Sequence, residues 1–288
     1  MIKESELILN PDGSIYHLNL LPEDIASTII TVGDPKRVAR ISAHFDVIEV
    51  KKEKREFVTH TGIYKGKRIT VIATGIGPDN IDIVLNELDA LVNIDFKTRK
   101  IKDELTSLNI IRIGTSGSLQ ADIPVDSFVL GKYGLGLDNM LRSYDLTGIT
   151  ETKIEEAFVQ HTNWDLDKGK PTVIKGSEVL LNKIQSEKTF TGFTATAGGF
   201  YGPQGRVLRL PLQDAELNHK MDSFSFEGTK LTNLEMETSA IYGLSKMLGH
   251  EALSANAIIA NRANQTFSKD PYKVVDELIE YVLFKLSL

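Results

Sequence analysis

Short apolar runs rich in β-branched residues alternate with segments of helical periodicity, and this alternation constrains the fold more than any other feature of the chain. Strands are expected at Thr28–Val32, Phe57–Thr61, Arg68–Thr74, Asn109–Ile113, Ser127–Gly131, Phe190–Ala195 and Ala252–Ala260. Helices are expected at Asp34–His44, Asp79–Asn93, Glu237–Leu248 and Pro271–Leu286. Lys65-Gly66-Lys67 predicts a hairpin turn. The alternation predicts an α/β fold with helices on both faces of one sheet, in a single domain over residues 1–288 with residues 1–15 as a loosely ordered arm.

Composition narrows the class of protein. The chain lacks cysteine, which excludes disulfides and thiolate metal sites, and its six histidines are scattered. The net charge is 33 − 39 = −6, so the electrostatic footprint of a nucleic-acid binder is absent. No apolar run approaches membrane-spanning length, and the N-terminal segment does not have the pattern of a secretory signal. We therefore expect a cytoplasmic protein without nucleic-acid or membrane partners.

Three glycine-rich turns follow expected strands: Gly33-Asp34-Pro35, Gly75-Ile76-Gly77-Pro78 and Gly114-Thr115-Ser116-Gly117. In open α/β sheets, ligands bind beyond the carboxyl ends of the strands. These turns are therefore the first places to expect a site, although neither a P-loop nor a G-x-G-x-x-G motif is present.

Two arginines near these turns could bind an anion. Arg37 lies at a helix start after Gly33, where backbone N–H groups favour negative charge, although such a pattern by itself more often reflects ordinary turn chemistry. Arg112 lies inside an apolar strand, so it requires either a buried acid or a ligand anion as its partner. By itself Arg55 reads as a solvated charge at a strand edge.

Two further segments have both a structural and a functional interpretation. Glu235-Met236-Glu237 precedes an apolar helix, and acids there complement the helix dipole. Gly198–Gly205 contains four glycines, and it could be a surface loop or a flexible lid.

Taken together and in order, eight segments resemble the uridine phosphorylases of the nucleoside phosphorylase family. They are His17–Leu20, Gly33–Arg37, Arg55–Phe57, Thr74–Gly77, Arg112–Gly117, Phe200–Arg206, Glu235–Glu237 and Ile259–Arg262. The resemblance covers roughly residues 16–285 and implies a three-layer α/β/α sandwich around a mixed sheet. It also implies a homo-oligomer built from dimers with shared active sites.

The resemblance assigns roles to individual residues. Phosphate would be bound by Gly33, Arg37, Arg112 and Thr115, together with Arg55 of a neighbouring subunit. Ribose would contact Glu235, Met236, Glu237 and the neighbour's His17. The base would be bound by Phe200, Gln204 and Arg206, because an amide and a guanidinium match the polar edge of uracil. Related purine enzymes use an aspartate near the position of Asn261-Arg262, which this chain lacks.

The implied reaction is phosphate-dependent cleavage of the N-glycosidic bond of uridine to uracil and ribose 1-phosphate, with Arg112, Gln204, Arg206 and Glu237 as its catalytic residues. Phosphate is a co-substrate, and no cofactor or metal is required. Some relatives hold a monovalent cation with a glutamate and a hydroxyl residue; here Glu56 matches but Asn80 replaces the hydroxyl, which argues against potassium. The polar segment Asp95–Ser107 is an insertion, and Gly202-Pro203 departs from the usual lid.

Two other functions compete with this interpretation. A hydrolytic nucleosidase of the same fold would not need a phosphate cage, so Arg37, Arg55, Arg112 and Thr115 argue against it. A catalytically silent nucleoside-binding protein should have lost site residues, and none is missing. The sequence leaves open whether thymidine or deoxyuridine is also cleaved, and whether the assembly is a dimer or a hexamer.

Overall fold

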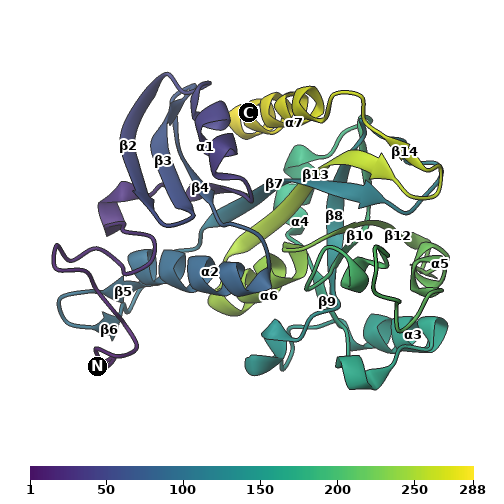
Figure 1. The fold of residues 1–288 in the computed structure, drawn as a ribbon. Helices are drawn as coiled ribbons and strands as arrows, with labels where there is room; N and C mark the ends of the chain where they lie inside the picture. Colours follow the sequence, from purple (N-terminus) through teal and green to yellow (C-terminus); the bar gives the residue numbers. More distant parts are fainter.

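A twelve-stranded mixed sheet forms the centre of the computed structural model, which describes residues 1–288 (Figure 1). The strands of this sheet are β1 (Thr28–Val32), β2 (Val47–Lys54), β3 (Phe57–Tyr64), β4 (Lys67–Ala73), β7 (Asn109–Ser118), β8 (Phe128–Gly136), β9 (Thr172–Lys175), β10 (Thr189–Thr196), β11 (Ser225–Phe226), β12 (Thr229–Glu235), β13 (Glu251–Asn261) and β14 (Thr266–Phe267). A separate hairpin consists of β5 (Ile94–Asp95) and β6 (Lys100–Ile101).

The order of the strands is β11-β12-β10-β8-β13-β7-β1-β4-β3-β2, with β9 beside β8 and β14 beside β13. The inner strands are mainly parallel; β7, for example, runs parallel to both β1 and β13. The sheet also curls, because Asn233 and Leu234 of β12 pair with Ser118 and Gly117 of β7. This curl brings the ends of β7, β10, β12 and β13 together.

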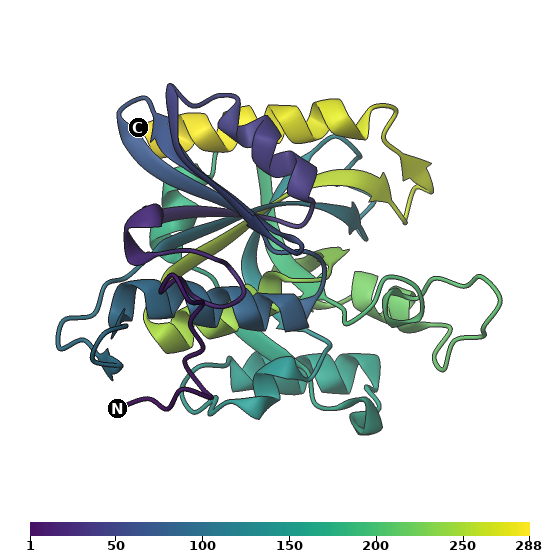
Figure 2. The same cartoon turned by 60° about the vertical axis from the view of Figure 1, so that its left-hand side comes forward.

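Helices cover both faces of the sheet (Figures 1 and 2). They are α1 (Pro35–Ser42), α2 (Pro78–Asn93), α3 (Thr152–Thr162), α4 (Glu178–Ile184), α5 (Leu217–Asp222), α6 (Thr238–Leu248) and α7 (Pro271–Ser287). Side chains of α1, α4 and α7 share one core cluster, whereas α2 and α6 share another. Ile29 packs in the second cluster and Ile30 in the first, because neighbouring strand residues point to opposite faces. The expected three-layer α/β/α fold is confirmed.

The expected strands and helices are all present, with ends shifted by a few residues in most cases and β7 and β8 extended by five. The sequence did not reveal β2, β9, β12, α3, α4, α5 or the two-residue strands. β2 carries charged side chains that alternate in exposure at the edge of the sheet. A lysine-rich edge strand avoids pairing with other sheets, and this composition conceals it in the sequence.

The first fifteen residues differ from the loose arm that the sequence indicated. Leu7 and Ile15 are buried, and Arg99 in the 95–107 insertion donates to the carbonyls of Ile2, Lys3 and Leu7. The insertion forms the β5–β6 hairpin, and its backbone accepts a hydrogen bond from Ile2 (2.8 Å). The N-terminal segment is therefore fixed by the insertion. None of the helices has the length and apolar character needed to cross a bilayer.

Candidate active site

A pocket of about 490 Å³ opens at the carboxyl ends of the central strands. The predicted residues that line it are Gly33, Arg37, Arg112, Thr115, Phe200, Gln204, Arg206, Glu235, Met236 and Glu237. They come from four separate segments of the chain. The structure thus gathers every predicted site residue except His17 and Arg55.

Arg37 lies on the first turn of α1, which Asp34 caps by accepting from Lys36 N (2.9 Å). Its side chain is buried, and one terminal nitrogen donates to Ile113 O (3.1 Å). No carboxylate pairs with it, and its Nε has no partner. Burial, reinforced by Arg112, lowers the pKa of Arg37 to about 10. Arg37 is therefore a buried cation that lacks a counter-ion within the chain.

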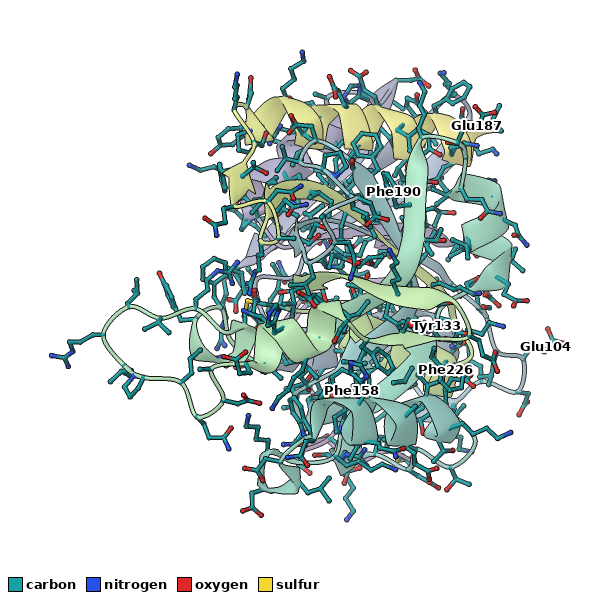
Figure 3. All side chains as sticks on the ribbon, turned by 90° about the vertical axis from the view of Figure 1, so that its right-hand side faces the viewer. Glu104, Tyr133, Phe158, Glu187, Phe190 and Phe226 are labelled. Atoms are coloured by element: carbon teal, nitrogen blue, oxygen red, sulfur yellow. The ribbon has the colours of Figure 1, made fainter.

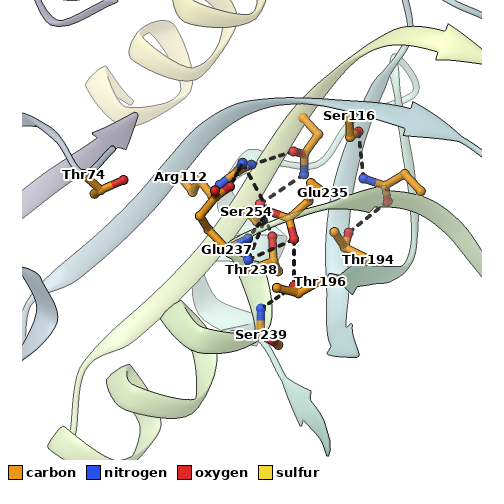
Figure 4. Close-up of polar contacts among 12 residues, drawn as sticks. Thr74, Arg112, Ser116, Thr194, Thr196, Glu235, Glu237, Thr238, Ser239 and Ser254 are labelled. Atoms are coloured by element: carbon orange, nitrogen blue, oxygen red, sulfur yellow. Dashed lines mark hydrogen bonds and ion pairs between the residues drawn. The ribbon is translucent and has the colours of Figure 1, made fainter. Parts of the chain in front are cut away.

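Arg112 has carboxylate partners. Its Nη2 lies 2.5 Å from Glu237 Oε2 and 3.1 Å from Glu235 Oε2, and its Nη1 donates to Asn256 Oδ1 (2.7 Å) (Figure 4). Burial alone would lower the pKa of Arg112, but the two carboxylates outweigh burial and hold that pKa above its ordinary value. Both interpretations of this residue are thus partly correct, since Arg112 is ion-paired and also faces the pocket.

The two glutamates differ in what they can still bind. Glu235 accepts from Thr196 Oγ1 and from the backbone N–H groups of Glu237 and Thr238, so its oxygens are fully engaged (Figure 4). Glu237 accepts from Gly77 N (2.8 Å) and from Arg112. Burial raises the pKa of Glu237 above its ordinary value, although Arg112 opposes this shift. Glu235 is therefore the structural member of the pair, and Glu237 is the one with capacity for a ligand.

Part of the pocket lining comes from the loop between β10 and α5, which projects from the body of the molecule (Figures 2 and 3). Gln204 is buried in this loop, with 2% of its surface exposed. Arg206 donates to Gln204 Oε1 and to Phe200 O (2.7 Å), and its guanidinium lies 3.8 Å from the centre of the Phe200 ring. Phe200, Gln204 and Arg206 thus form one connected group.

Arg262 completes this group, and the sequence interpretation missed it. It donates to the backbone carbonyl of Gln204 and to Gln204 Oε1 (3.1 Å). Burial, together with Arg206, lowers the pKa of Arg262 to about 10. In the sequence, this position was part of the resembling segment Ile259–Arg262 and was noted for the absence of an aspartate, but no role was assigned to Arg262. Neighbouring Asn261 is buried and binds three backbone groups of nearby loops, so it has a structural role.

Several apolar residues that line the pocket also escaped prediction, among them Ile76, Ile259 and Phe267. Phe267 comes from β14, a two-residue strand without a sequence signal of its own. Asn256 could have been suspected, because it is an amide inside the apolar run of β13.

His17 and Arg55 lie outside the pocket, and the two segments that carry them contact each other. Arg55 is exposed at the tip of the β2–β3 turn, in a left-handed conformation (φ 55°). Lys54 donates to Asn10 Oδ1 (2.9 Å) and to Tyr16 O, which ties this turn to the segment carrying His17. The His17 ring contacts Phe57 edge-on, with centres 6.5 Å apart. The two residues therefore belong to one structural unit.

The residues considered for a monovalent cation have other contacts. Asn80 Nδ2 donates to Ile76 O (3.3 Å), and a side chain at Gly75 would meet both Asn80 and Glu56. No group of three or more His, Asp or Glu side chains is arranged to hold a metal ion. That no potassium ion binds at Glu56 stays a prediction.

Comparison with known proteins agrees with this geometry. Residues 27–280 match the model of the phosphorylase superfamily. A solved nucleoside phosphorylase from Trypanosoma brucei, described as showing uridine phosphorylase activity, superposes with a TM-score of 0.87 at 31% identity, covering 98% of this chain and 99% of that one.

Curated relatives include enzymes for both kinds of base. A uridine phosphorylase from Thermococcus kodakarensis is 29% identical over 264 residues, covering 90% of this chain and 81% of the relative. A DeoD-type purine nucleoside phosphorylase from Listeria welshimeri is 26% identical over 240 residues, covering 83% of each. The chain belongs to the phosphorylase superfamily, and within it the similarity includes enzymes of the uridine type.

Proposed function

We propose that this protein is a uridine phosphorylase, which cleaves the N-glycosidic bond of uridine with phosphate to give uracil and ribose 1-phosphate. One observation carries the proposal. A single pocket is lined by the buried cations Arg37 and Arg112, by the Gln204–Arg206 pair and by Glu235-Met236-Glu237. These groups match the phosphate, the base and the sugar of the two substrates.

Phosphate binding is supported by the unpaired charge of Arg37. A guanidinium that is buried without a counter-ion is unfavourable, and a phosphate dianion would supply the missing charge and several acceptor oxygens. The phosphate would also contact the backbone of Gly33, the hydroxyl of Thr115 and the remaining N–H groups of Arg112. We call this set of groups the phosphate cradle. A hydrolytic nucleosidase has no use for such a cradle.

Selection of uracil is supported by the fixed orientation of Gln204. Arg206 and Arg262 both donate to Oε1, which leaves the Nε2 hydrogens for a pyrimidine carbonyl. Arg206 would bind another carbonyl, and Phe200 would pack on the ring. Purine cleavage would require an acid near the purine ring, whereas Asn261 is neutral and engaged by backbone groups.

The mechanism follows from these positions. Glu237 would accept hydrogen bonds from the ribose hydroxyls while Met236 packs on the sugar. As the glycosidic bond breaks, negative charge builds on uracil beside Arg206, and positive charge builds on the sugar beside the bound phosphate. Phosphate then forms the new bond to the anomeric carbon. Catalysis is by positioning and preorganised electrostatics, without a cofactor and with phosphate as the second substrate.

A shared site in a homodimer is supported by the charge count. Within one chain the pocket lining holds three arginines, two glutamates and one aspartate, so these charges cancel and a phosphate dianion would leave the pocket with excess negative charge. Arg55 of a partner subunit would supply the missing positive charge, and His17 would accompany it because Lys54 ties the two segments together.

We also assign the enzyme to the cytoplasm, because a chain without cysteine suits a reducing compartment.

The decisive assay measures release of free base from uridine, thymidine and inosine, each with and without phosphate. We expect uracil from uridine only when phosphate or arsenate is present, and little base from inosine. Equal release in phosphate-free buffer would indicate a nucleosidase instead.

A further inference from the structure

Glu87 on α2 is a partly buried acid that does not line the pocket, and all its hydrogen bonds go to one short segment. It accepts from the backbone N–H groups of His17 (3.0 Å) and Leu18 (2.9 Å), and its Oε1 lies 2.6 Å from His17 Nδ1. Its side chain is 14% exposed. Two carboxylate oxygens thus receive three donors from the residues at and after His17.

The contact with the ring fixes where the imidazole carries its proton. An ionised carboxylate can only accept, so Nδ1 must be the donor in this pair. In the neutral ring, the remaining lone pair is then on Nε2. Tyr16 contacts the His17 ring edge-on at 4.8 Å between centres, and 27% of the His17 side chain is exposed. The contacts with Glu87 and Tyr16 thus fix the orientation of the His17 ring, and its Nε2 is left as a hydrogen-bond acceptor.

We propose that Glu87 is a positioning residue of the active site. It holds His17 as the Nδ1–H tautomer, so that Nε2 accepts a hydrogen bond from the 5′-hydroxyl of the nucleoside bound by the partner subunit. This inference rests on the proposed function, in which His17 is donated across the dimer. It predicts that the enzyme selects nucleosides with a free 5′-hydroxyl and that Glu87, which contacts no substrate, sets part of this selectivity.

A purely structural role for Glu87 is the competing explanation, since two of its contacts are to backbone N–H groups. Glu87→Gln separates the two roles. An amide has a single acceptor oxygen, so if that oxygen stays on the backbone N–H groups, its NH₂ group faces Nδ1 and donates to it. The ring proton must then move to Nε2. Asp82→Asn removes the same charge from the same helix without touching His17, and serves as the control.

The first test is nitrogen NMR of the His17 ring at about pH 9, where an ordinary imidazole is neutral. We expect a protonated Nδ1 and a bare Nε2 in the native protein and in Asp82→Asn, and the reverse in Glu87→Gln. A native ring protonated at Nε2, or a Glu87→Gln ring with unchanged protonation, would overturn the proposal. This readout does not depend on activity.

The second test compares kcat/KM for uridine and 5′-deoxyuridine. We expect Glu87→Ala and His17→Ala each to reduce the preference for uridine by about tenfold, the effect of one lost hydrogen bond. The double variant should lose no more than either single variant. If His17→Ala changes the preference and Glu87→Ala does not, Glu87 is only structural. If His17→Ala itself has no effect, the donation of His17 is wrong, which is a failure of the proposed site.

Discussion

Arg37 and Arg112 show that two buried arginines in one pocket can have opposite effects on stability. Arg112 neutralises Glu235 and Glu237, whereas Arg37 forms no ion pair. Removing Arg112 leaves two buried carboxylates uncompensated, a change that costs about 3–5 kcal/mol in other proteins. Removing Arg37 takes away an unpaired charge and one hydrogen bond, so the free energy of unfolding should change by no more than about 1 kcal/mol.

Thermal unfolding with and without phosphate tests this contrast. The native protein should be stabilised by phosphate, by about 2.7 kcal/mol at a concentration one hundred times Kd. Arg37→Ala should keep the native melting temperature in plain buffer and lose most of the phosphate-dependent increase. Arg112→Ala should melt well below the native protein in either buffer. A large phosphate response in Arg37→Ala would contradict the assignment.

The pH dependence of phosphate binding should follow Arg37. Its pKa of about 10 in the folded protein lies below the ordinary arginine value, so the folded state binds this proton less tightly than the unfolded chain. The penalty for charging Arg37 is therefore present below about pH 10 and is relieved as the pH rises through it. Because phosphate needs the charged form, its affinity should fall over that range. Calorimetric titration at pH 8, 9 and about 10.5 checks this.

In the proposed mechanism, Arg206 stabilises the leaving group. Its guanidinium contacts Gln204 and Phe200, so Arg206→Ala should disorder this loop and remove the charge that we propose faces the departing uracil. We expect a loss of about 2–4 kcal/mol of transition-state stabilisation, visible in kcat as well as KM, as for a lost oxyanion donor. Steady-state kinetics with uridine measures it, and near-normal turnover would show that Arg206 is not part of the site.

At the scale of elements, the 95–107 hairpin holds the N-terminal segment in place through hydrogen bonds. Arg99 alone donates to three carbonyls of residues 2–7. Arg99→Ala should therefore speed hydrogen exchange in residues 2–9 and leave the sheet unchanged. Lys97→Ala in the same hairpin is the control, because its side chain is exposed and makes no hydrogen bond or ion pair. Unchanged exchange in Arg99→Ala would show that burial of Leu7 and Ile15 suffices.

For the whole molecule, the central prediction is that active sites are shared between subunits. Arg37→Ala and Arg55→Ala should each be nearly inactive, but their residues would serve different sites. In an isologous dimer, a mixed pair places both lesions in one site and leaves the other intact. Random mixing makes about half of the dimers mixed, so about a quarter of native activity should return. Verified heterodimers that stay inactive would show that both arginines act within one subunit.

The sequence determined the periodic elements and predicted which residues form the candidate site. β1 and α2 were predictable because their apolar residues recur with the period of a buried strand and of a helix, and this pattern is visible in the local sequence. We could propose Arg37, Arg112, Gln204 and Arg206 as site residues because each lies in a segment that resembles the family. β2 was not, because a charged edge strand has no apolar face to reveal it.

Only the tertiary structure decided which of these residues face one another. Arg112 meets Glu237 because β7 and the start of α6 are adjacent in space, although 125 residues separate them in the chain. Arg262 reaches Gln204, 58 residues away, through a loop whose path follows from packing. Glu87 reaches His17 across 70 residues for the same reason. Such pairings depend on the order and curl of the strands, which local periodicity does not encode.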